Sequence, residues 1–246
     1  MLKNFTAILA ISFLAVPMAQ AEKVHLAVAS NFTGPAKQLA ETFQRTSGHK
    51  AVLSFGSTGK LYAQIIHGAP FDIFLAADAE RPSRLVFDGL ALEESLFTYA
   101  VGRLALYSPT LRTSTALRNK LESGDFQRLA IANPKTAPYG LAAEELLGNL
   151  KINTKGKLVF GENIAQTYQF VASGNADLGL VAAAQLKASD SAGWMVPETL
   201  HAPIRQQAVL LNRGKDNPAA RAFLAFLRSD PAGKMIRSFG YGLGEG

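Results

Sequence analysis

Short apolar runs alternate along this chain with longer stretches in which apolar residues recur every three or four positions. The runs at 24–28, 51–55, 71–76, 129–133 and 177–182 have the length and composition of buried strands. The stretches between them have the spacing of amphipathic helices and are bounded by glycine and proline. This alternation predicts an α/β protein with mostly parallel sheets.

Two further apolar segments indicate that the chain forms two lobes. The segment 97–107 is long for one strand and has Gly102 in its middle, so we interpret it as a strand that crosses from one lobe to the other. The segment 204–211 is interpreted as the strand that returns. The prediction is therefore two lobes, each a mixed, mostly parallel sheet flanked by helices, joined by two crossing strands. The predicted boundaries are 22–102 with 208–246 for lobe I, and 103–207 for lobe II.

The stretch 54–61, with the sequence S-F-G-S-T-G-K-L, joins a predicted strand to a predicted helix. The first turn of a helix leaves backbone N–H groups without partners and carries the positive end of the helix dipole, so it attracts an anion. The hydroxyls of Ser57 and Thr58 would add donors. A simpler interpretation is that one of them only caps the helix. A nucleotide P-loop is excluded. In this stretch only two residues separate the glycines, where a P-loop has four, and leucine follows the lysine, where a P-loop has serine or threonine.

Three other helix starts follow a predicted strand, and the first of them presents small polar side chains. Ser30 and Asn31 follow the first predicted strand, Tyr139 lies at the start of the helix after strand 129–133, and Ile164 stands at the head of the next helix. In parallel sheets such loops lie at the carboxyl edge of the strands, where ligands bind. Each loop can also be interpreted as a cap or as loop packing, but their repetition favours one pocket between the lobes.

The chain begins with the features of a secretory signal peptide. Lys3 precedes an apolar run from Phe5 to Val16, and the small residues Ala19-Gln20-Ala21 follow, so we expect residues 1–21 to be removed. No apolar stretch reaches the roughly 18 to 20 residues that a membrane-spanning helix needs. We therefore expect an exported protein, and because the chain has no lipobox cysteine we expect it to be free rather than tethered.

Composition argues against several kinds of chemistry. The chain has no cysteine, which removes thiolate catalysis and thiolate metal sites, and its four histidines lack metal-ligand spacing, so no cation site is predicted. The net charge of +6 comes from scattered Lys and Arg, which argues against a nucleic-acid partner. Asp72 and Asp78 are interpreted as capping or turn residues rather than as paired catalytic carboxylates.

Six segments, in the same order, resemble the periplasmic molybdate-binding proteins of ABC importers. They are A-S-N-F at 29–32, F-G-S-T-G at 55–59, G-A-P-F-D-I-F-L-A-A-D at 68–78, N-P-K-T-A-P-Y-G at 133–140, S-G-N-A-D-L-G at 173–179 and R-S-F-G-Y at 237–241. No single segment is specific, but together they span nearly all of the chain that follows residue 21. The resemblance implies a type II periplasmic-binding-protein fold in a monomer that is not an enzyme and has no cofactor. It also implies a periplasmic location and an inner-membrane ABC permease as partner.

The resemblance further implies a site that holds a tetrahedral oxyanion by hydrogen bonds alone. Asn31 would supply a side-chain donor and its backbone N–H, with Ser30 beside it. Thr58 would supply a hydroxyl where the family has serine, and Ser57 stands in a second tier. Backbone N–H groups would come from two residues of lobe II, Tyr139 and Ile164.

One position departs from part of the family. Some members use a tyrosine in the strand after the last of these loops, and this chain has Ala182 there. Members with asparagine in the first loop carry a tyrosine in the Pro-Tyr-Gly loop instead. The hydroxyl of Tyr139 is therefore the expected replacement.

The expected ligand is molybdate, with tungstate as a nearly isosteric second ligand. Molybdate is fully deprotonated at neutral pH, so its oxygens only accept hydrogen bonds and suit a cage of donors. Phosphate often keeps a proton, and the resulting mismatch costs about 1 to 3 kcal/mol when buried. A binder of sulfate or another tetrahedral oxyanion remains an alternative. So does an exported hydrolase with Ser30, Ser57 or Thr58 as nucleophile, although the chain lacks a G-x-S-x-G elbow and has no histidine in the four loops.

Overall fold

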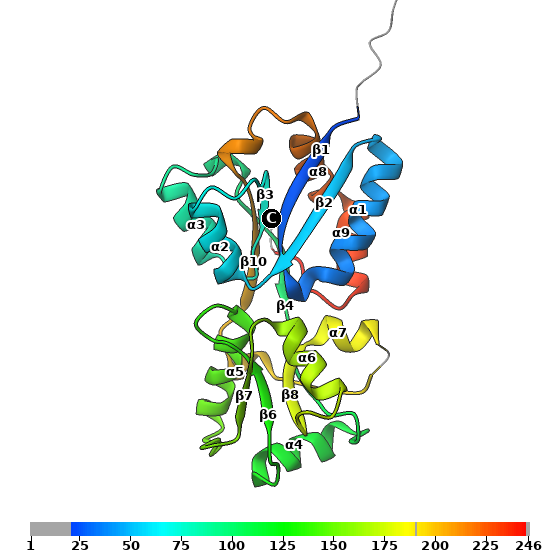
Figure 1. The fold of residues 1–246 in the computed structure, drawn as a ribbon. Coiled ribbons are helices and arrows are strands. Elements are labelled where there is room, and N and C mark those ends of the chain that lie inside the picture. The colour runs from blue at the N-terminus through cyan, green and yellow to red at the C-terminus, as the bar shows by residue number, and fades with distance from the viewer. Residues whose placement is uncertain (1–20, 190, 245–246) are drawn as a thin grey trace, which may run out of the picture.

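The computed structural model describes residues 21–189 and 191–244, which form two lobes connected by neighbouring crossings of the chain (Figure 1). The expected signal peptide, residues 1–21, lies almost entirely outside the described residues. Each lobe contains one five-stranded sheet with helices on both faces, as the alternation of strands and helices predicted. Within the described residues, no helix is long and apolar enough to cross a membrane.

Lobe I contains both ends of the described chain. Its strands are β1 (Lys23–Ala29), β2 (Lys50–Gly56), β3 (Ile73–Leu75), β4 (Phe97–Gly102) and β10 (Ile204–Leu210). Its helices are α1 (Thr33–Ser47), α2 (Thr58–Ile66), α3 (Glu80–Phe87), α8 (Pro218–Leu227) and α9 (Asp230–Ser238), with 3-10 turns η1 (Ser30–Phe32), η2 (Glu93–Ser95) and η4 (Asn212–Gly214). Figure 1 shows α2 and α3 on one side of this sheet and α1 and α9 on the other.

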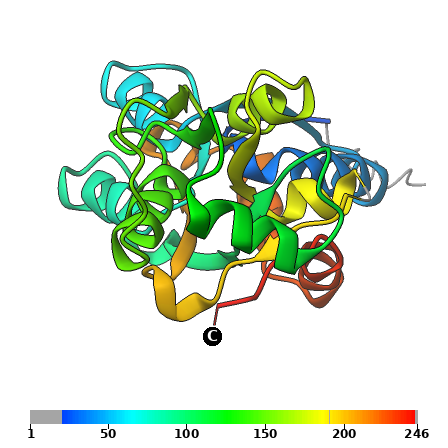
Figure 2. The same ribbon diagram turned by 90° about the horizontal axis from the view of Figure 1, so that it is seen from below.

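Lobe II is formed by the middle of the chain. Its strands are β5 (Leu104–Tyr107), β6 (Leu129–Ala132), β7 (Leu158–Gly161), β8 (Leu178–Ala182) and β9 (Trp194–Met195). Its helices are α4 (Ser114–Ser123), α5 (Pro138–Asn149), α6 (Ile164–Ala172) and α7 (Ala183–Ala188), with the 3-10 turn η3 (Glu198–Leu200). Seen from below, α5 and α7 lie on opposite sides of this sheet (Figure 2).

The two sheets have equivalent topologies. The strand order is β2-β1-β3-β10-β4 in lobe I and β7-β6-β8-β5-β9 in lobe II. In each lobe the first three strands are parallel to one another and the last two are joined by antiparallel pairing. The register pairs Ala29 with Gly56 in one lobe and Ala132 with Gly161 in the other, so equivalent strand ends occupy equivalent positions.

Each sheet buries both of its faces. On β1, Val24, Leu26 and Val28 pack with residues of α1 and α8, whereas Ala27 belongs to a cluster with residues of α2 and α3. This alternation follows from the two-residue period of a strand. Lobe II repeats the arrangement with one cluster toward α4 and α5 and another toward α6 and α7. Because both faces of each sheet are covered, a ligand can reach the sheets only at the strand ends, which lie between the lobes.

The crossings differ in detail from the prediction. The long apolar segment divides at Arg103 into β4 of lobe I and β5 of lobe II, as the interpretation of a crossing strand requires. The returning strand β10 begins at Ile204 and pairs with β4 over its first residues, Ile204 with Gly102 and Gln206 with Ala100. Residues 204–207 therefore lie in the sheet of lobe I, and the predicted boundary at 208 is four residues too late. The strand itself begins where the segment 204–211 predicted it, and only the assignment of its first four residues to lobe II differs.

Candidate functional site

All six predicted site residues line one small pocket between the lobes. Its lining comprises Ala29, Ser30, Asn31, Gly56, Ser57, Thr58 and Ala77 from lobe I, and Ala137, Pro138, Tyr139 and Ile164 from lobe II. We call this the interlobe pocket. Its volume is about 10 Å³, roughly the space that one buried water requires. In this closed arrangement the pocket excludes organic solutes and leaves room only for a small species.

Ser57 occupies the N-cap position of α2 but does not cap the helix. Its backbone has the extended conformation typical of an N-cap, yet its hydroxyl accepts no hydrogen bond from the first turn. The side chain is buried, and its Oγ has no hydrogen-bond partner in the described part of the chain. A buried hydroxyl without a partner is costly, so this atom indicates a place prepared for a ligand.

Thr58 presents a hydroxyl beside Ser57. Its Oγ1 accepts a hydrogen bond of 3.1 Å from the Ala77 N–H, which fixes the side chain and leaves the hydroxyl proton available to donate. Ser30 is also buried at the pocket, at the first position of η1. The interpretation of this loop as a simple helix cap is therefore wrong for Ser57, and Thr58 is held by the neighbouring loop.

The lobe II side of the pocket consists of two helix starts. The side chain of Asn163 caps α6 by accepting from the Ala165 and Gln166 N–H groups, both at 3.0 Å. The N–H of Ile164 lies before these two and has no acceptor within its own helix. In α5, the Ala137 carbonyl accepts from Gly140 and Leu141, and the Tyr139 N–H precedes them in the same way.

Asn31 differs from its expected role. Its Nδ2 donates to Gln206 Oε1 at 2.9 Å and to Tyr241 Oη at 3.1 Å, so both side-chain protons have partners inside the protein. Tyr241 in turn donates its hydroxyl proton to the Asn31 carbonyl at 2.7 Å. These contacts hold the residue rigidly in lobe I. The donor that Asn31 can offer to a ligand is therefore its backbone N–H, and the expected side-chain donor is already engaged.

The hydroxyl of Tyr139 is also engaged within the protein. It accepts a hydrogen bond from Gln206 Nε2 at 3.4 Å and lies so close to β4 that a Cβ atom on Gly102 would be 2.2 Å from it. Burial raises the pKa of Tyr99, Tyr139 and Tyr241, so all three hydroxyls stay protonated at neutral pH. The Tyr139 hydroxyl thus belongs to a buried polar cluster at the crossing, and its expected role as a ligand donor stays a prediction.

Ala182, where some relatives of this kind carry tyrosine, is not part of the pocket lining. Its N–H donates to Gln185 Oε1 at 2.9 Å, and Gln185 Nε2 donates to the Ile164 carbonyl at 3.1 Å. Gln185 therefore ties the end of β8 to the start of α6. It supports the lobe II side of the pocket from behind.

Direct contacts join the lobes beside the pocket. The Gly59 N–H in the first turn of α2 donates to the Thr136 carbonyl at 2.8 Å. Lys60 Nζ lies 2.8 Å from Glu162 Oε2, and both side chains are about half exposed. Arg81 also reaches the Lys135 carbonyl at 3.4 Å. The described arrangement is a closed one in which α2 touches lobe II directly.

The electrostatic character of the pocket comes from dipoles and hydroxyls. Among the described residues that line it, none carries a formal charge, and no group of three or more His, Cys, Asp or Glu side chains gathers anywhere in that part of the chain. The starts of η1, α2, α5 and α6 all meet at the pocket, so it is surrounded by the positive ends of helices. Such a site favours a small anion that accepts hydrogen bonds on every side.

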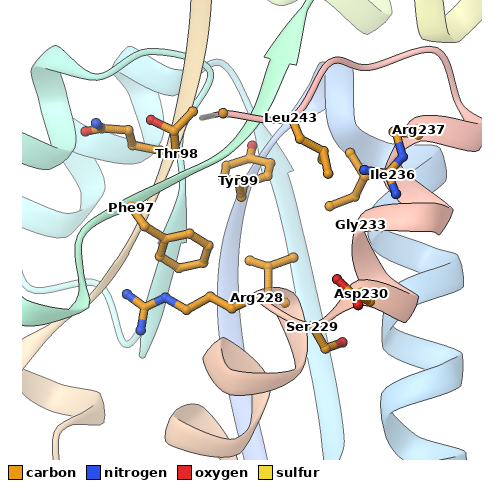
Figure 3. Close-up of a pocket in the computed structure, with 13 residues that line it drawn as sticks. Phe97, Thr98, Tyr99, Arg228, Ser229, Asp230, Gly233, Ile236, Arg237 and Leu243 are labelled. Carbon is orange, nitrogen blue, oxygen red and sulfur yellow. The ribbon is translucent and has the colours of Figure 1, made fainter. Parts of the chain in front are cut away.

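A larger cavity lies in lobe I, away from these residues. It measures about 520 Å³ and is lined by β4, the start of α9 and the C-terminal segment. Figure 3 shows Phe97, Tyr99, Asp230 and Leu243 around it. The Arg228 guanidinium stacks 4.2 Å above the Phe97 ring. None of the six predicted residues lines this cavity, so it is separate from the interlobe pocket.

Sequence reasoning missed the residues that hold the site from behind. Gln206 and Tyr241 contact Asn31 from positions 175 and 210 residues away in the chain. Nothing in the local pattern around them indicates a polar partner. The Ser-Phe-Gly-Tyr segment that ends in Tyr241 was noted for its resemblance, but its role was not identified.

Comparison with known proteins places the chain in a family. The model of the bacterial extracellular solute-binding protein family matches residues 24–242. The molybdate-binding protein ModA of Azotobacter vinelandii is 49% identical over 231 residues, covering 92% of each chain. ModA of Rhodobacter capsulatus is 44% identical over 239 residues, covering 96% of this chain and 94% of the relative.

The fold agrees with these relatives. The solved structure of the Azotobacter vinelandii periplasmic molybdate-binding protein superimposes with a TM-score of 0.84 at 37% identity, covering 90% of this chain and all of the other. The described topology is the two-lobed periplasmic-binding-protein architecture that the sequence resemblance implied. The chain belongs to the bacterial extracellular solute-binding protein family, alongside the periplasmic molybdate-binding proteins.

Proposed function

We propose that this protein captures molybdate or tungstate in the interlobe pocket and delivers it, in the closed form, to an ABC permease in the inner membrane. The proposal places the protein in the periplasm as a solute-binding protein without cofactor or catalytic activity. The observation that carries it is the buried Ser57 hydroxyl, which has no hydrogen-bond partner among the described residues and lies at a pocket where four helix starts meet. The relatives named for molybdate support the choice of cargo.

The proposed donors come from both lobes. Lobe I would contribute the backbone N–H of Asn31 and the hydroxyls of Ser30, Ser57 and Thr58. Lobe II would contribute the backbone N–H groups of Tyr139 and Ile164. Because a tetrahedral dianion needs donors on all sides, its hydrogen bonds are complete only when the lobes close. Binding would therefore stabilise the closed arrangement, which the permease can distinguish from an open one.

Selectivity in this proposal rests on proton count and size. A site built from N–H and O–H donors penalises an anion that keeps a proton, because that proton faces donors. Phosphate is disfavoured for this reason. Sulfate carries the same charge as molybdate but is smaller, so it would stretch the hydrogen bonds of a rigid closed pocket. Molybdate and tungstate are nearly the same size, and we expect the pocket to accept both.

Calorimetric titration of the purified protein with molybdate, tungstate, sulfate and phosphate tests the proposal. We expect tight binding of the first two and weak or no binding of the others. Preference for sulfate would establish the alternative assignment as a binder of another tetrahedral oxyanion. Absence of binding for all four anions would refute the proposed function.

A further inference from the structure

Gln206 lies at the centre of a buried polar cluster directly behind the interlobe pocket. Its residue is fully buried, and its amide makes three hydrogen bonds to side chains. Oε1 accepts from Asn31 Nδ2 at 2.9 Å and from the Tyr99 hydroxyl at 3.1 Å, while Nε2 donates to the Tyr139 hydroxyl at 3.4 Å. One amide thus connects a pocket residue of lobe I with a pocket residue of lobe II.

The position of Gln206 in the chain explains how it reaches both lobes. It lies on β10, two residues after the chain returns from lobe II, and the pairing of β10 with β4 is irregular between Gln206 and Gln207. Such irregularities bend a strand and redirect a side chain. On the facing strand, a Cβ atom at Gly102 would lie 2.6 Å from Gln206 Nε2. Only glycine leaves room there for the amide to meet the Tyr139 hydroxyl.

The orientation of Asn31 depends on this amide. If the anion contacts the Asn31 backbone N–H, as the proposed function requires, the Asn31 side chain is free to act as an anchor. That anchor is held from two sides, by Gln206 and by Tyr241. Loss of Gln206 Oε1 would leave the Asn31 Nδ2 and Tyr99 hydroxyl donors without this acceptor. A buried donor without an acceptor is costly, so both side chains would move.

We propose that Gln206 is a positioning residue of the anion site: it fixes Asn31 in lobe I through Oε1, and it completes its own hydrogen bonds through Nε2 only when Tyr139 of lobe II is in place. The position of Asn31 on the lobe I side of the pocket is thereby coupled to the closed position of lobe II. This inference rests on the proposed function and adds a residue that does not itself contact the anion.

The first test replaces the amide with a group of similar length that cannot hydrogen-bond. Gln206→Met should weaken molybdate binding by about tenfold or more, because partners of the amide lose their hydrogen bonds inside the protein. The matched control is Gln207→Met on the same strand. Gln207 lines the separate cavity of Figure 3 and its Oε1 has no partner among the described residues, so we expect this variant to bind as the wild type does.

The second test restores the hydrogen bonds by protonation. In Gln206→Glu, a protonated carboxyl can accept from Asn31 and Tyr99 and donate to Tyr139, as the amide does. The groups that face this position are Tyr99 of β4, Tyr139 of α5 and Tyr241 of the C-terminal segment, with the Asp78 charge acting on Tyr99. Burial holds such carboxyls protonated up to a pKa of about 8 to 9 in documented cases.

We therefore expect Gln206→Glu to bind like the wild type at about pH 6 and to lose affinity as the carboxyl ionises, relative to wild type at each pH. If the hydrogen bonds of residue 206 did not position Asn31, Gln206→Glu would bind molybdate as weakly as Gln206→Met at low pH. That result would overturn the inference. So would a folded Gln206→Met that binds within about twofold of the wild type.

A double-mutant cycle covers the case in which Gln206→Met fails to fold. Tyr139→Phe removes the hydroxyl that accepts from Gln206 and should weaken binding in the wild type but have little further effect in Gln206→Leu, since that side chain neither donates nor accepts. Additive effects would mean that Tyr139 and Gln206 act separately, and the coupling would be refuted. A wild type that binds no oxyanion would refute the proposed function together with this inference.

Discussion

At the scale of single residues, the hydroxyls around the interlobe pocket have distinct roles despite their similar chemistry. The Ser57 hydroxyl has no hydrogen-bond partner within the described chain, whereas the Thr58 hydroxyl accepts from the Ala77 N–H. Both side-chain N–H groups of Asn31 donate to partners within the protein, Gln206 and Tyr241. A donor without a partner can hydrogen-bond the anion without breaking a hydrogen bond inside the protein. A donor that already has partners instead holds the surrounding side chains in position.

Ser57→Ala should therefore weaken molybdate binding without destabilising the unliganded protein. We expect a loss of about 1 to 3 kcal/mol of binding free energy, because the hydroxyl is buried and its donor would be missing. The thermal midpoint without anion should stay the same or rise slightly, since a buried unpaired group disappears. Calorimetry and a thermal melt of the same sample measure the two effects.

Thr113→Ala provides the matched contrast for Ser57. Thr113 is the N-cap of α4 and its hydroxyl does accept from the Ala116 N–H at 3.2 Å, far from the pocket. Its removal should cost about 0.5 to 2 kcal/mol of stability and leave anion affinity unchanged. If Ser57→Ala lowered the thermal midpoint as Thr113→Ala does, the hydroxyl of Ser57 would have a structural role that the geometry does not show.

At the scale of elements, the helix starts and the two crossing segments were predictable, and the side-chain contacts at the crossing were not. The loops before α2, α5 and α6 carry local signals, namely glycine, proline and small polar residues after an apolar run, and the structure places them as expected. The strand β10 begins at Ile204, as the apolar segment 204–211 predicted, but that segment did not indicate that its first residues already belong to the sheet of lobe I. The cluster around Gln206 depends on partners far apart in sequence, and no periodicity reports such contacts.

Gly102→Ala tests the crossing at this scale. The new Cβ would lie 2.2 Å from the Tyr139 hydroxyl oxygen and 2.6 Å from Gln206 Nε2, so the cluster must move. We expect a loss of about 1 to 3 kcal/mol of unfolding free energy, with weaker anion binding. Adding Tyr139→Phe removes one of the two closest atoms and should recover part of the stability. Denaturant unfolding of both variants decides between this explanation and simple loss of glycine flexibility, which no second substitution would repair.

At the scale of the whole molecule, α2 is one of the elements through which the two lobes are in contact. Its first turn lines the pocket, donates the Gly59 N–H to the Thr136 carbonyl and carries Lys60 to Glu162. The anion site and the closing contact therefore share one helix start. Changes on the outer side of this turn should alter closure while leaving the donors of the pocket in place.

Gly59→Ala should hinder closure. A Cβ at Gly59 would meet the Thr136 Cα at 3.0 Å and its carbonyl oxygen at 3.1 Å, so the lobes could not approach fully. We expect about tenfold weaker molybdate binding, while alanine should slightly stabilise the open protein by its helix propensity. Gly148→Ala in α5, where a Cβ meets nothing within 4 Å, should give the same propensity gain with unchanged affinity. Equal affinities for the two variants would show that this contact does not limit closure.

The Lys60–Glu162 ion pair should contribute only modestly. Both side chains are about half exposed, so breaking the pair with Glu162→Gln should cost about 0.2 to 1 kcal/mol of binding free energy, and less at high salt. Reversal at Lys60→Glu should be worse, and the exchange Lys60→Glu with Glu162→Lys should recover most of the loss. Affinities at low and high salt measure these effects. A loss of affinity that does not depend on salt would contradict an electrostatic contribution of this ion pair to closure.

The meeting of helix starts at the pocket has an evolutionary consequence. On the proposed binding mode, Asn31, Tyr139 and Ile164 hold the cargo by main-chain amide hydrogens, which survive exchange of a residue for any other except proline. Substitutions can therefore change the side chains around the anion far more readily than they can remove these backbone donors. A change of preference toward a proton-bearing anion would require a new acceptor, and position 57 is where one substitution could introduce it.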